Sequence, residues 1–393
     1  MNRPLRILQM AHVRWYNAEA QYALDLSLEC RRLGHRVVFF TQSGSPVADK
    51  ARKSGFDTFE ESGFNAKGLA AANVFPALLR FLRLLDREKF DAVEIHRSEV
   101  RFLIAGACRM KGIPIVGVRG DKRPVRKDPF NRFIYRKALS GIVASNHTIA
   151  SDLEKGMGPL PFLRTIHGGI DPEIFSPEGS VSDIRSELGL PDNAMLVGIV
   201  GRLGGDKGHF DFLAAAQKSI SRHERLHFVI LAKQSNHLEN ELRRRIDAGS
   251  RLKRHTSIIG YQPDLSAVMR AFDVGVVAST DSEANCRVGL EWMASGVPLI
   301  GTRIGVLPDL IDSGKTGFLV SPRAPGELAG RIGQLAAQPA MARQLGLQSR
   351  QRVLKHFTIN ICVRKHLALI YDLIKKQGRD LIKKQGRRSK VNY

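Results

Sequence analysis

Short apolar runs alternate with longer amphipathic stretches along most of the chain. Runs of three to seven residues, rich in Val, Ile, Leu and Phe, lie at 5–10, 35–40, 90–96, 112–118, 142–145, 195–200, 226–231, 272–278 and 299–301. Between the first two runs lies a helical pattern, residues 19–33, which Gly34 closes. Such near-continuous apolar runs are typical of strands that are buried on both faces of a parallel sheet. The pattern therefore predicts an α/β fold of parallel strands joined by helices.

A length of 393 residues predicts two such domains rather than one. The alternation breaks at residues 165–177, where Gly168, Gly169, Pro172 and Pro177 interrupt it. Glycine and proline in this density indicate a linker. We therefore place the domain boundary near residues 171–182.

The formal net charge of +23 predicts an anionic partner, which could be a nucleic acid, a membrane surface or a phosphorylated substrate. Aromatic residues make up only 7% of the chain and do not cluster within the basic runs, which favours a membrane over a nucleic acid. No apolar run approaches the roughly 18 residues that a membrane-spanning helix needs, and no secretory signal pattern opens the chain. The scattered cysteines predict neither a disulfide framework nor a zinc site, and they are Cys30, Cys108, Cys286 and Cys362.

A glycine-rich turn follows the apolar run at 195–200. It reads Gly201-Arg202-Leu203-Gly204-Gly205-Asp206-Lys207-Gly208 and leads into a helical pattern at 209–221. Backbone N–H groups at such a turn, together with the helix dipole, can bind a phosphate, and Arg202 and Lys207 add positive charge. Taken alone, an ordinary tight connection between a strand and a helix explains this turn almost as well as a phosphate-binding site does.

Two glutamates, Glu283 and Glu291, stand eight positions apart after the apolar run at 272–278. The pattern predicts that Glu283 lies where a strand's carboxyl end passes into a helix, with Glu291 about two turns further on. Ligands of open α/β sheets bind at the carboxyl ends of strands, where carboxylates can accept hydrogen bonds from sugar hydroxyls. The alternative is that Glu283 caps a helix and that Glu291 lies on its solvated face.

These motifs together resemble one enzyme family. The segment Leu290-Glu291-Trp292-Met293-Ala294-Ser295-Gly296-Val297-Pro298, with Glu283 before it, is similar to the E-x7-E signature of the retaining nucleotide-sugar glycosyltransferases of family 4. The turn at 201–208 resembles the G-R-x-x-x-x-K-G motif of the same family, and residues 168–177 resemble its N-G-I-D-x-x-x-F-x-P element. The resemblance implies a GT-B fold: two Rossmann-like domains with a cleft between them and a C-terminal helix that crosses back to the N-terminal domain.

The resemblance also implies domain bounds and a donor site. We expect an acceptor domain at 1–173, a donor domain at 174–355, a crossover helix at 356–376 and a basic tail at 377–393. Arg202 and Lys207 are expected to hold the donor diphosphate, Glu291 the ribose and Glu283 the transferred sugar. The resemblance implies retention of anomeric configuration, no metal and no cofactor. Further donor contacts are expected from Gly168, Gly169, Gly201, Tyr261, Gln262, Asn285, Cys286, Arg287 and Val288.

Acceptor contacts are expected at the ends of the N-terminal strands. His96 ends the run at 90–96, and Arg119, Asp121 and Arg123 follow the run at 112–118. Relatives commonly have a histidine where Arg119 stands, so Asp121 is the candidate base or hydroxyl-orienting group, and the two arginines can clamp an acceptor phosphate or carboxylate. The family's first loop usually carries a glycine pair, whereas residues 14–19 contain no glycine, and Arg14 and Asn17 are the candidate side chains to take over its role. The alternatives are a structural His96 and a basic surface loop that pairs with Asp121.

Two basic segments predict contact with an anionic membrane. Residues 122–137 mix Lys and Arg with aromatic side chains, and residues 372–379 are repeated identically at 380–387. A core-facing helix and a solvated tail are the respective alternatives. We therefore expect a peripheral protein at the cytoplasmic face of the membrane that glycosylates a lipid-linked or lipopolysaccharide-type acceptor of the cell envelope. A catalytically inactive nucleotide-sugar-binding protein and, with less support, a nucleic-acid-binding protein stay open, whereas the missing G-x-G-x-x-G excludes a nicotinamide-dependent oxidoreductase.

Overall fold

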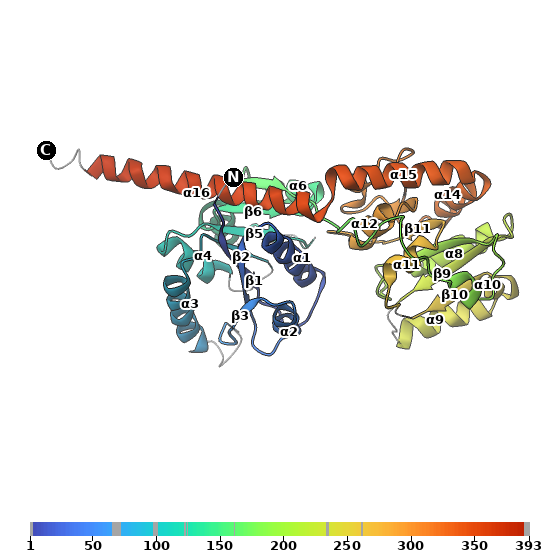
Figure 1. Cartoon of the computed structure of the whole chain (residues 1–393), viewed down its shortest axis with the longest axis horizontal. Helices are drawn as coiled ribbons and strands as arrows, with labels where there is room; N and C mark the ends of the chain where they lie inside the picture. The colour runs from blue at the N-terminus through green and yellow to red at the C-terminus, as the bar shows by residue number, and fades with distance from the viewer. Residues whose placement is uncertain are drawn as a thin grey trace. The chain divides into compact units, whose positions relative to one another are not determined.

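The computed structural model describes residues 3–64, 72–96, 101–121, 123, 125–160, 162–232, 236–260 and 262–388. It divides into two units (Figure 1), the first formed by Met1–His167 with Ile359–Tyr393 and the second by Gly168–Thr358. The N-terminal segment of the first unit ends at His167, a few residues before the expected boundary at 173, and the final helix belongs to the first unit.

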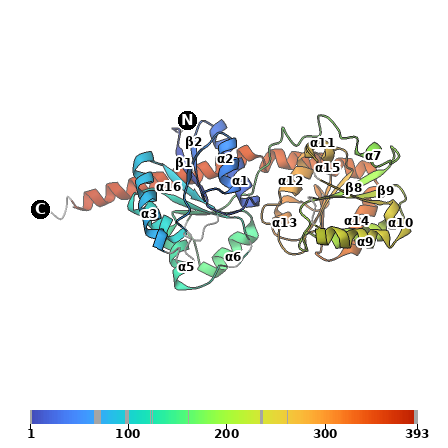
Figure 2. The ribbon, with the colours of Figure 1, turned by 90° about the horizontal axis from the view of Figure 1, so that it is seen from below.

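The first unit contains a seven-stranded parallel sheet in the order β3-β2-β1-β4-β5-β6-β7. Its strands are β1 Arg6–Ala11, β2 Arg36–Thr41, β3 Asp57–Glu60, β4 Ala92–Ile95, β5 Ile115–Arg119, β6 Gly141–Ala144 and β7 Leu163–Thr165. Its helices are α1 Ala18–Arg32, α2 Pro46–Lys53, α3 Val74–Glu88, α4 Arg101–Met110, α5 Pro129–Phe133, a π-helical turn Ile134–Ala138, α6 His147–Met157 and α16 Ile359–Arg388. Figure 2 shows the helices on either side of this sheet.

The second unit contains a six-stranded parallel sheet in the order β10-β9-β8-β11-β12-β13. Its strands are β8 Met195–Val200, β9 Leu226–Leu231, β10 Thr256–Ile259, β11 Val274–Val277, β12 Leu299–Thr302 and β13 Gly317–Val320. Its helices are α7 Ile184–Glu187, α8 His209–Ser219, α9 Asn236–Asp247, α10 Ser250–Arg254, α11 Leu265–Arg270, α12 Arg287–Ala294, α13 Leu307–Leu310, α14 Pro325–Ala337 and α15 Pro339–His356.

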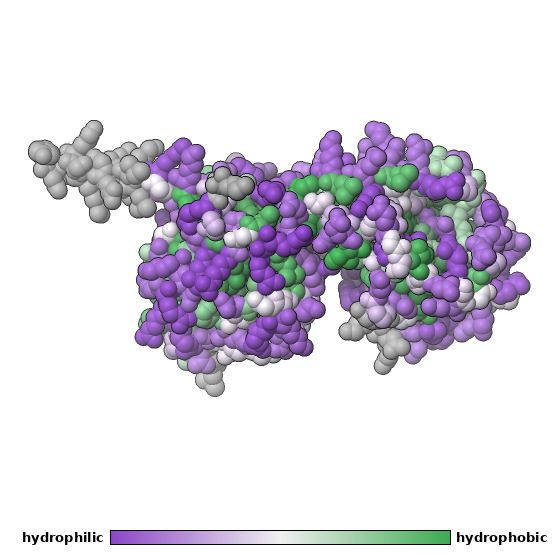
Figure 3. Space-filling model, viewed as in Figure 1, coloured by the Kyte–Doolittle hydropathy of each residue, from purple (hydrophilic) through white to green (hydrophobic). Residues whose placement is uncertain are grey.

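Each sheet buries apolar side chains under its helices. In the first unit, strand residues such as Ile7 and Phe39 pack with α1 and with Val363 and Ile370 of α16 in one buried cluster. In the second unit, separate clusters form around Phe212 on α8 and around Trp292 on α12. The surface visible in Figure 3 is mostly hydrophilic, in keeping with 61 lysine and arginine residues. Within the residues described, no helix combines the length and apolar character that crossing a bilayer would require.

The last helix is longer than expected. Its predicted range ended at residue 376, with a separate tail beyond, whereas α16 continues through both copies of the octapeptide repeat to Arg388. Each copy carries leucine, isoleucine, lysine and glutamine and only one glycine, so helix propensity favours continuation. The backbone of the tail through Arg388 is therefore helical.

Candidate functional site

A pocket of about 250 Å³ lies at the carboxyl edge of the second sheet. The strand order reverses between β8 and β11, and open α/β sheets bind ligands in the crevice beside such a reversal. The pocket walls come from the ends of β8 and β11, the start of α8 and the first turns of α12. The lining residues are Ile199, Val200, Gly201, Lys207, His209, Val276, Val277, Ala278, Ser279, Glu283, Arg287, Val288 and Glu291.

The glycine-rich turn between β8 and α8 packs closely against the end of β11. Gly208 has φ 72°, and a Cβ atom there would lie 1.8 Å from the carbonyl oxygen of Ala278. Gly201 has φ 153°, which also favours glycine. The Thr280 N–H donates to the Asp206 carbonyl at 2.9 Å, so the turn is held against the end of β11.

The two cations of this turn differ in their surroundings. Lys207 lines the pocket, and its side chain is 26% exposed. The Arg202 side chain is 68% exposed and donates to Asp206 Oδ1 at 3.1 Å, outside the lining of the pocket. Of the two cations of this turn, Lys207 is therefore the one that lines the pocket, whereas a diphosphate contact from Arg202 stays a prediction.

Glu283 forms a direct ion pair with Lys207 in the pocket. The Lys207 Nζ and the Ser279 Oγ both donate to Glu283 Oε1 at 2.5 Å, and the Glu283 side chain is 8% exposed. The Val306 N–H donates to the Glu283 carbonyl at 2.8 Å, which fixes the backbone of this residue. A buried carboxylate held by an ammonium and a hydroxyl is oriented rather than solvated.

Glu291 is also buried, with 7% of its side chain exposed, although a solvated helix face was the alternative. It accepts a hydrogen bond from Arg287 Nε at 2.8 Å, one turn earlier on α12. The neighbouring Trp292 is fully buried, and a Cβ atom at Gly275 would lie 2.5 Å from its ring. Trp292 therefore anchors α12 directly against β11, which sets the depth of Glu291 in the pocket.

The loop before α12 supplies a further buried polar group. Asn285 Oδ1 is buried and accepts no hydrogen bond within the described part of the chain. A Cβ atom at Gly168 would lie 3.7 Å from it, so these two predicted donor contacts are neighbours, with Gly169 next in sequence. Cys286 caps α12 with φ 38° and is buried, and burial beside Glu283 holds the pKa of its thiol well above the usual range. The thiol of Cys286 is therefore protonated at the helix start, and its donor contact stays a prediction.

Two of the expected donor contacts, Tyr261 and Gln262, come after β10 in the sequence. Tyr261 is outside the described residues, and Gln262, which follows β10, is half-buried and does not line the pocket. Arg287 and Val288 do line it, as predicted.

Two polar residues of the pocket, Ser279 and His209, were not predicted from the sequence. Ser279 follows β11 directly, and its position at a strand end was the available signal. His209 begins α8 after Gly208 and is 1% exposed. Burial lowers the pKa of His209 to about 4, with a further contribution from Lys207, so this imidazole is neutral at pH 7.

In the first unit, Arg119, Asp121 and Arg123 form one ion-pair group after β5. Asp121 accepts from the Arg123 N–H at 2.9 Å and from its guanidinium at 3.1 Å, and Arg119 Nη2 lies 3.6 Å from Asp121. Burial opposes ionisation of Asp121, but the hydrogen bond and charge of Arg123 and the charge of Arg119 outweigh it and lower its pKa. The three predicted residues are together, and Asp121 is an anion that two arginines already hold.

His96 and Asn17 have local partners. His96 is 3% exposed and hydrogen-bonds through Nε2 to Gln9 at 2.8 Å, and burial lowers its pKa to about 4. The Asn17 side chain accepts from the Ala20 N–H at 2.9 Å and caps α1. These contacts give both residues structural roles, and their acceptor contacts stay predictions.

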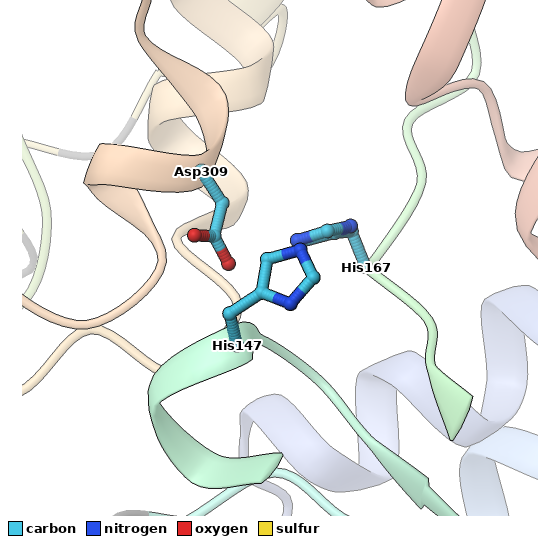
Figure 4. A group of neighbouring side chains, drawn as sticks. All are labelled: His147, His167 and Asp309. Carbon is cyan, nitrogen blue, oxygen red and sulfur yellow. The ribbon is translucent and has the colours of Figure 1, made fainter. Parts of the chain in front are cut away.

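Two further histidines of the first unit, His147 and His167, lie side by side. The rings of His147, at the start of α6, and His167 pack edge to face with centroids 5.4 Å apart (Figure 4). Asp309, also drawn there, lies on α13 of the second unit.

Comparisons of the sequence identify relatives of both units. The family described as "Glycosyltransferase Family 4" matches residues 20–174, and "Glycosyl transferases group 1" matches residues 194–338. A D-inositol 3-phosphate glycosyltransferase of Corynebacterium jeikeium is 33% identical over 192 residues, 47% of this chain and 46% of the relative. The UDP-Gal:alpha-D-GlcNAc-diphosphoundecaprenol alpha-1,3-galactosyltransferase of Escherichia coli is 26% identical over 255 residues, 62% of this chain and 66% of the relative. The alignments thus span about half to two-thirds of these curated relatives.

Comparisons of the structure identify the fold. A glycosyltransferase from Rickettsia africae superposes with a TM-score of 0.86 at 18% identity, covering 95% of this chain and all of that one. Anabaena HepE, solved in complex with UDP and glucose, superposes with a TM-score of 0.76 at 17% identity, covering 94% of this chain and all of that one. Both likenesses confirm the GT-B fold with its two Rossmann-like sheets. With family matches to both units, and with the motif glycines and glutamates gathered at the carboxyl edge of the second sheet, the chain belongs to the group 1 glycosyltransferases of family 4.

Proposed function

We propose that this protein transfers a sugar from a nucleotide-sugar donor, bound in the pocket of the second unit, to an acceptor bound by the first unit. The observation that carries this proposal is the joint placement of Lys207, Glu283 and Glu291 in one pocket beside the strand reversal. That pocket combines phosphate-binding backbone and a cation with two carboxylates that suit hydroxyl groups.

We propose a UDP-sugar as the donor to test first. The Anabaena structure contains UDP and glucose, and the name of the E. coli relative specifies UDP-Gal. The diphosphate is assigned to the glycine-rich turn and Lys207, the ribose to Glu291 and the transferred sugar to Glu283. Asn285 Oδ1, buried without a described partner, offers one more acceptor for a sugar hydroxyl.

In this mechanism the chemical step depends on charge stabilisation. Negative charge develops on the departing diphosphate, and preorganised cations stabilise it more than they stabilise the ground state. Lys207 performs this role from within the pocket, and Arg202 approaches when its exposed side chain leaves Asp206. We propose that transfer proceeds with retention and needs no metal, because these cations neutralise the leaving group.

We propose a lipid-linked or lipopolysaccharide-type acceptor, presented at the cytoplasmic face of a membrane. The E. coli relative's name specifies a diphosphoundecaprenol acceptor. In this chain, the ring of Phe102 packs against the rings of Phe130 and Phe133, and the three side chains are 37%, 54% and 48% exposed. They lie on α4 (labelled in Figure 1) and on α5 (labelled in Figure 2), which is near the exposed cations Arg132 and Arg136 in sequence. Exposed aromatic side chains among cations suit the headgroup region of an anionic membrane.

The experiment is a binding and turnover assay on the full chain. UDP-, GDP- and ADP-sugars are screened by thermal shift against the wild type, Lys207→Ala and the control Lys218→Ala, whose lysine is exposed at the end of α8 outside the pocket. We expect one donor class to stabilise the wild type and Lys218→Ala but not Lys207→Ala. Equal stabilisation of all three proteins would remove Lys207 from the donor site. Donor binding without sugar transfer to any lipid-linked acceptor would favour the inactive binding protein.

A further inference from the structure

A second pocket, of about 360 Å³, lies in the first unit at the opposite edge of its sheet from the predicted acceptor residues. Its lining includes Ile115, the first residue of β5, Ser140, which precedes β6, and Phe162, which precedes β7. Arg119 ends β5 at the other edge. A five-residue strand separates the two edges by about 13 Å. This pocket is therefore distinct from the acceptor site.

The floor of the pocket is apolar and well packed. Leu139 and Leu373 are buried, 7% and 3% exposed, and Ile113 is 8% exposed. A Cβ atom at Gly141 would lie 2.9 Å from the side chain of Leu373, so the glycine allows α16 to pack closely against the start of β6. An aliphatic group would find buried contact here.

The mouth of the pocket carries only positive charge. Arg109, Arg136, Lys137 and Lys376 line it with exposed side chains, and no acidic residue is among its described lining. Arg109 donates to the Lys137 carbonyl at 3.1 Å, and the Lys376 ammonium lies 4.5 Å from the centroid of Phe162. None of these four cations forms an ion pair within the part of the chain that the structure describes. Gathering like charges without counter-charges costs free energy that an anionic ligand would offset.

The first copy of the octapeptide repeat contributes three residues to the lining of this pocket. Leu373, Lys376 and Gln377 all come from residues 372–379, at spacings of three and four that share one helix face. Leu373 contributes to the floor and Lys376 to the charged mouth. One copy of the repeat thus supplies an apolar and a cationic contact to the same pocket.

We propose that this pocket binds a phosphate group attached to an apolar chain. The guanidinium and ammonium groups at the mouth bind the phosphate oxygens, and the apolar chain covers Leu139 and Leu373. The ligand is a phospholipid headgroup with the start of its acyl region, and a free phosphate is the other source of the same anion. This site does not depend on donor binding in the second unit.

The test uses isothermal titration calorimetry of the full chain at fixed ionic strength. The titrants are monomeric dihexanoyl phosphatidic acid, the zwitterionic dihexanoyl phosphatidylcholine and inorganic phosphate. The variant Lys137→Gln/Lys376→Gln is compared with Lys50→Gln/Lys53→Gln, which removes the same charge from exposed positions on α2. Circular dichroism and thermal unfolding check that each variant is folded.

We expect phosphatidic acid to bind the wild type and the α2 variant with equal affinity, and the pocket variant at least about tenfold more weakly, because two phosphate contacts are lost. Binding of phosphatidic acid without competition from inorganic phosphate identifies a lipid, whereas equal affinity for inorganic phosphate identifies a free phosphate. The proposal is overturned if neither anion binds the wild type, if phosphatidylcholine binds as well as phosphatidic acid, or if both double variants lose affinity equally. UDP binding is measured separately, so a failed donor assignment would leave this result unaffected.

Discussion

Because Lys207 pairs with Glu283, the contribution of the lysine to stability can be measured separately from its contribution to nucleotide binding. In the unliganded protein, Lys207 Nζ lies 2.5 Å from Glu283 Oε1, and the carboxylate is 8% exposed. A hydrogen bond to a charged group contributes about 1.5–3 kcal/mol, and removing one partner leaves the other desolvated. Lys207→Ala should therefore lower the free energy of unfolding of the second unit by about 2 kcal/mol.

The same change should weaken nucleotide binding for a different reason. The loss of one charge-assisted contact to phosphate, about 2 kcal/mol, corresponds to roughly 30-fold in Kd. Glu283→Gln should leave UDP affinity unchanged or improve it, because it removes a negative charge that competes with the diphosphate for Lys207. If Glu283 contacts the transferred sugar, Glu283→Gln should still reduce kcat by about 100-fold.

A double-mutant cycle measures both effects. Urea unfolding and UDP titration are compared for the wild type, each single variant and Lys207→Ala/Glu283→Gln. The double variant should recover much of the stability lost in Lys207→Ala, because no carboxylate is left unpaired, and should recover none of the UDP affinity. The reasoning fails if Lys207→Ala binds UDP as the wild type does, or if Glu283→Gln loses as much affinity as Lys207→Ala.

Three other predictions concern the loop, the crossover helix and the absence of a metal requirement. Gly208→Ala should abolish UDP binding or lower the free energy of unfolding by at least about 2 kcal/mol, because residue 208 has a positive φ and its new Cβ would meet the Ala278 carbonyl. The control Gly205→Ala, whose Cβ would have open space, should leave thermal unfolding and UDP titration nearly unchanged. Burial opposes protonation of His366, but Glu94, 2.7 Å away, outweighs it and raises the His366 pKa to about 10. The stability that the protonated His366 contributes is complete below about pH 6.5 and is lost as the pH rises towards 10. The unfolding free energy of the wild type should therefore fall between pH 7 and pH 9.5 more steeply than that of His366→Gln. Transfer should persist in excess EDTA, and loss of activity that Mg²⁺ or Mn²⁺ restores would contradict the assignment of charge neutralisation to the protein's cations.

Buried central strands were the most predictable part of the fold. The runs at 195–200 and 226–231 coincide with β8 and β9, because central parallel strands are apolar on both faces. The edge strands β3 Asp57–Glu60 and β7 Leu163–Thr165 were missed, since short strands with half-exposed polar residues carry no such signal. The π-helical turn at Ile134–Ala138 also has no pattern of its own in the sequence.

The position of the candidate site was predictable, but its internal contacts were not. Motif spacing placed Lys207 and Glu283 near strand ends, yet their direct ion pair joins residues far apart in sequence. The same limitation applies to His96, whose strand-end position suggested an acceptor contact. The sequence did not indicate that its ring is enclosed with Gln9 in a buried network that includes Glu94 and His366. Such burial depends on α16, which follows nearly the whole chain in sequence.

The return of α16 to the first unit also affects the order in which the chain can fold during synthesis. Residues of α16, among them Val363, Leu367 and Ile370, complete a core whose remaining residues are made before residue 167, so a nascent first unit lacks one wall until the ribosome has passed residue 373. The second unit is continuous, and its ends meet where the Ile170 N–H donates to the Phe357 carbonyl at 3.0 Å. We therefore expect residues 168–358 to reach a protease-resistant state on the ribosome first, while the earlier-made segment depends on chaperones until its last helix emerges.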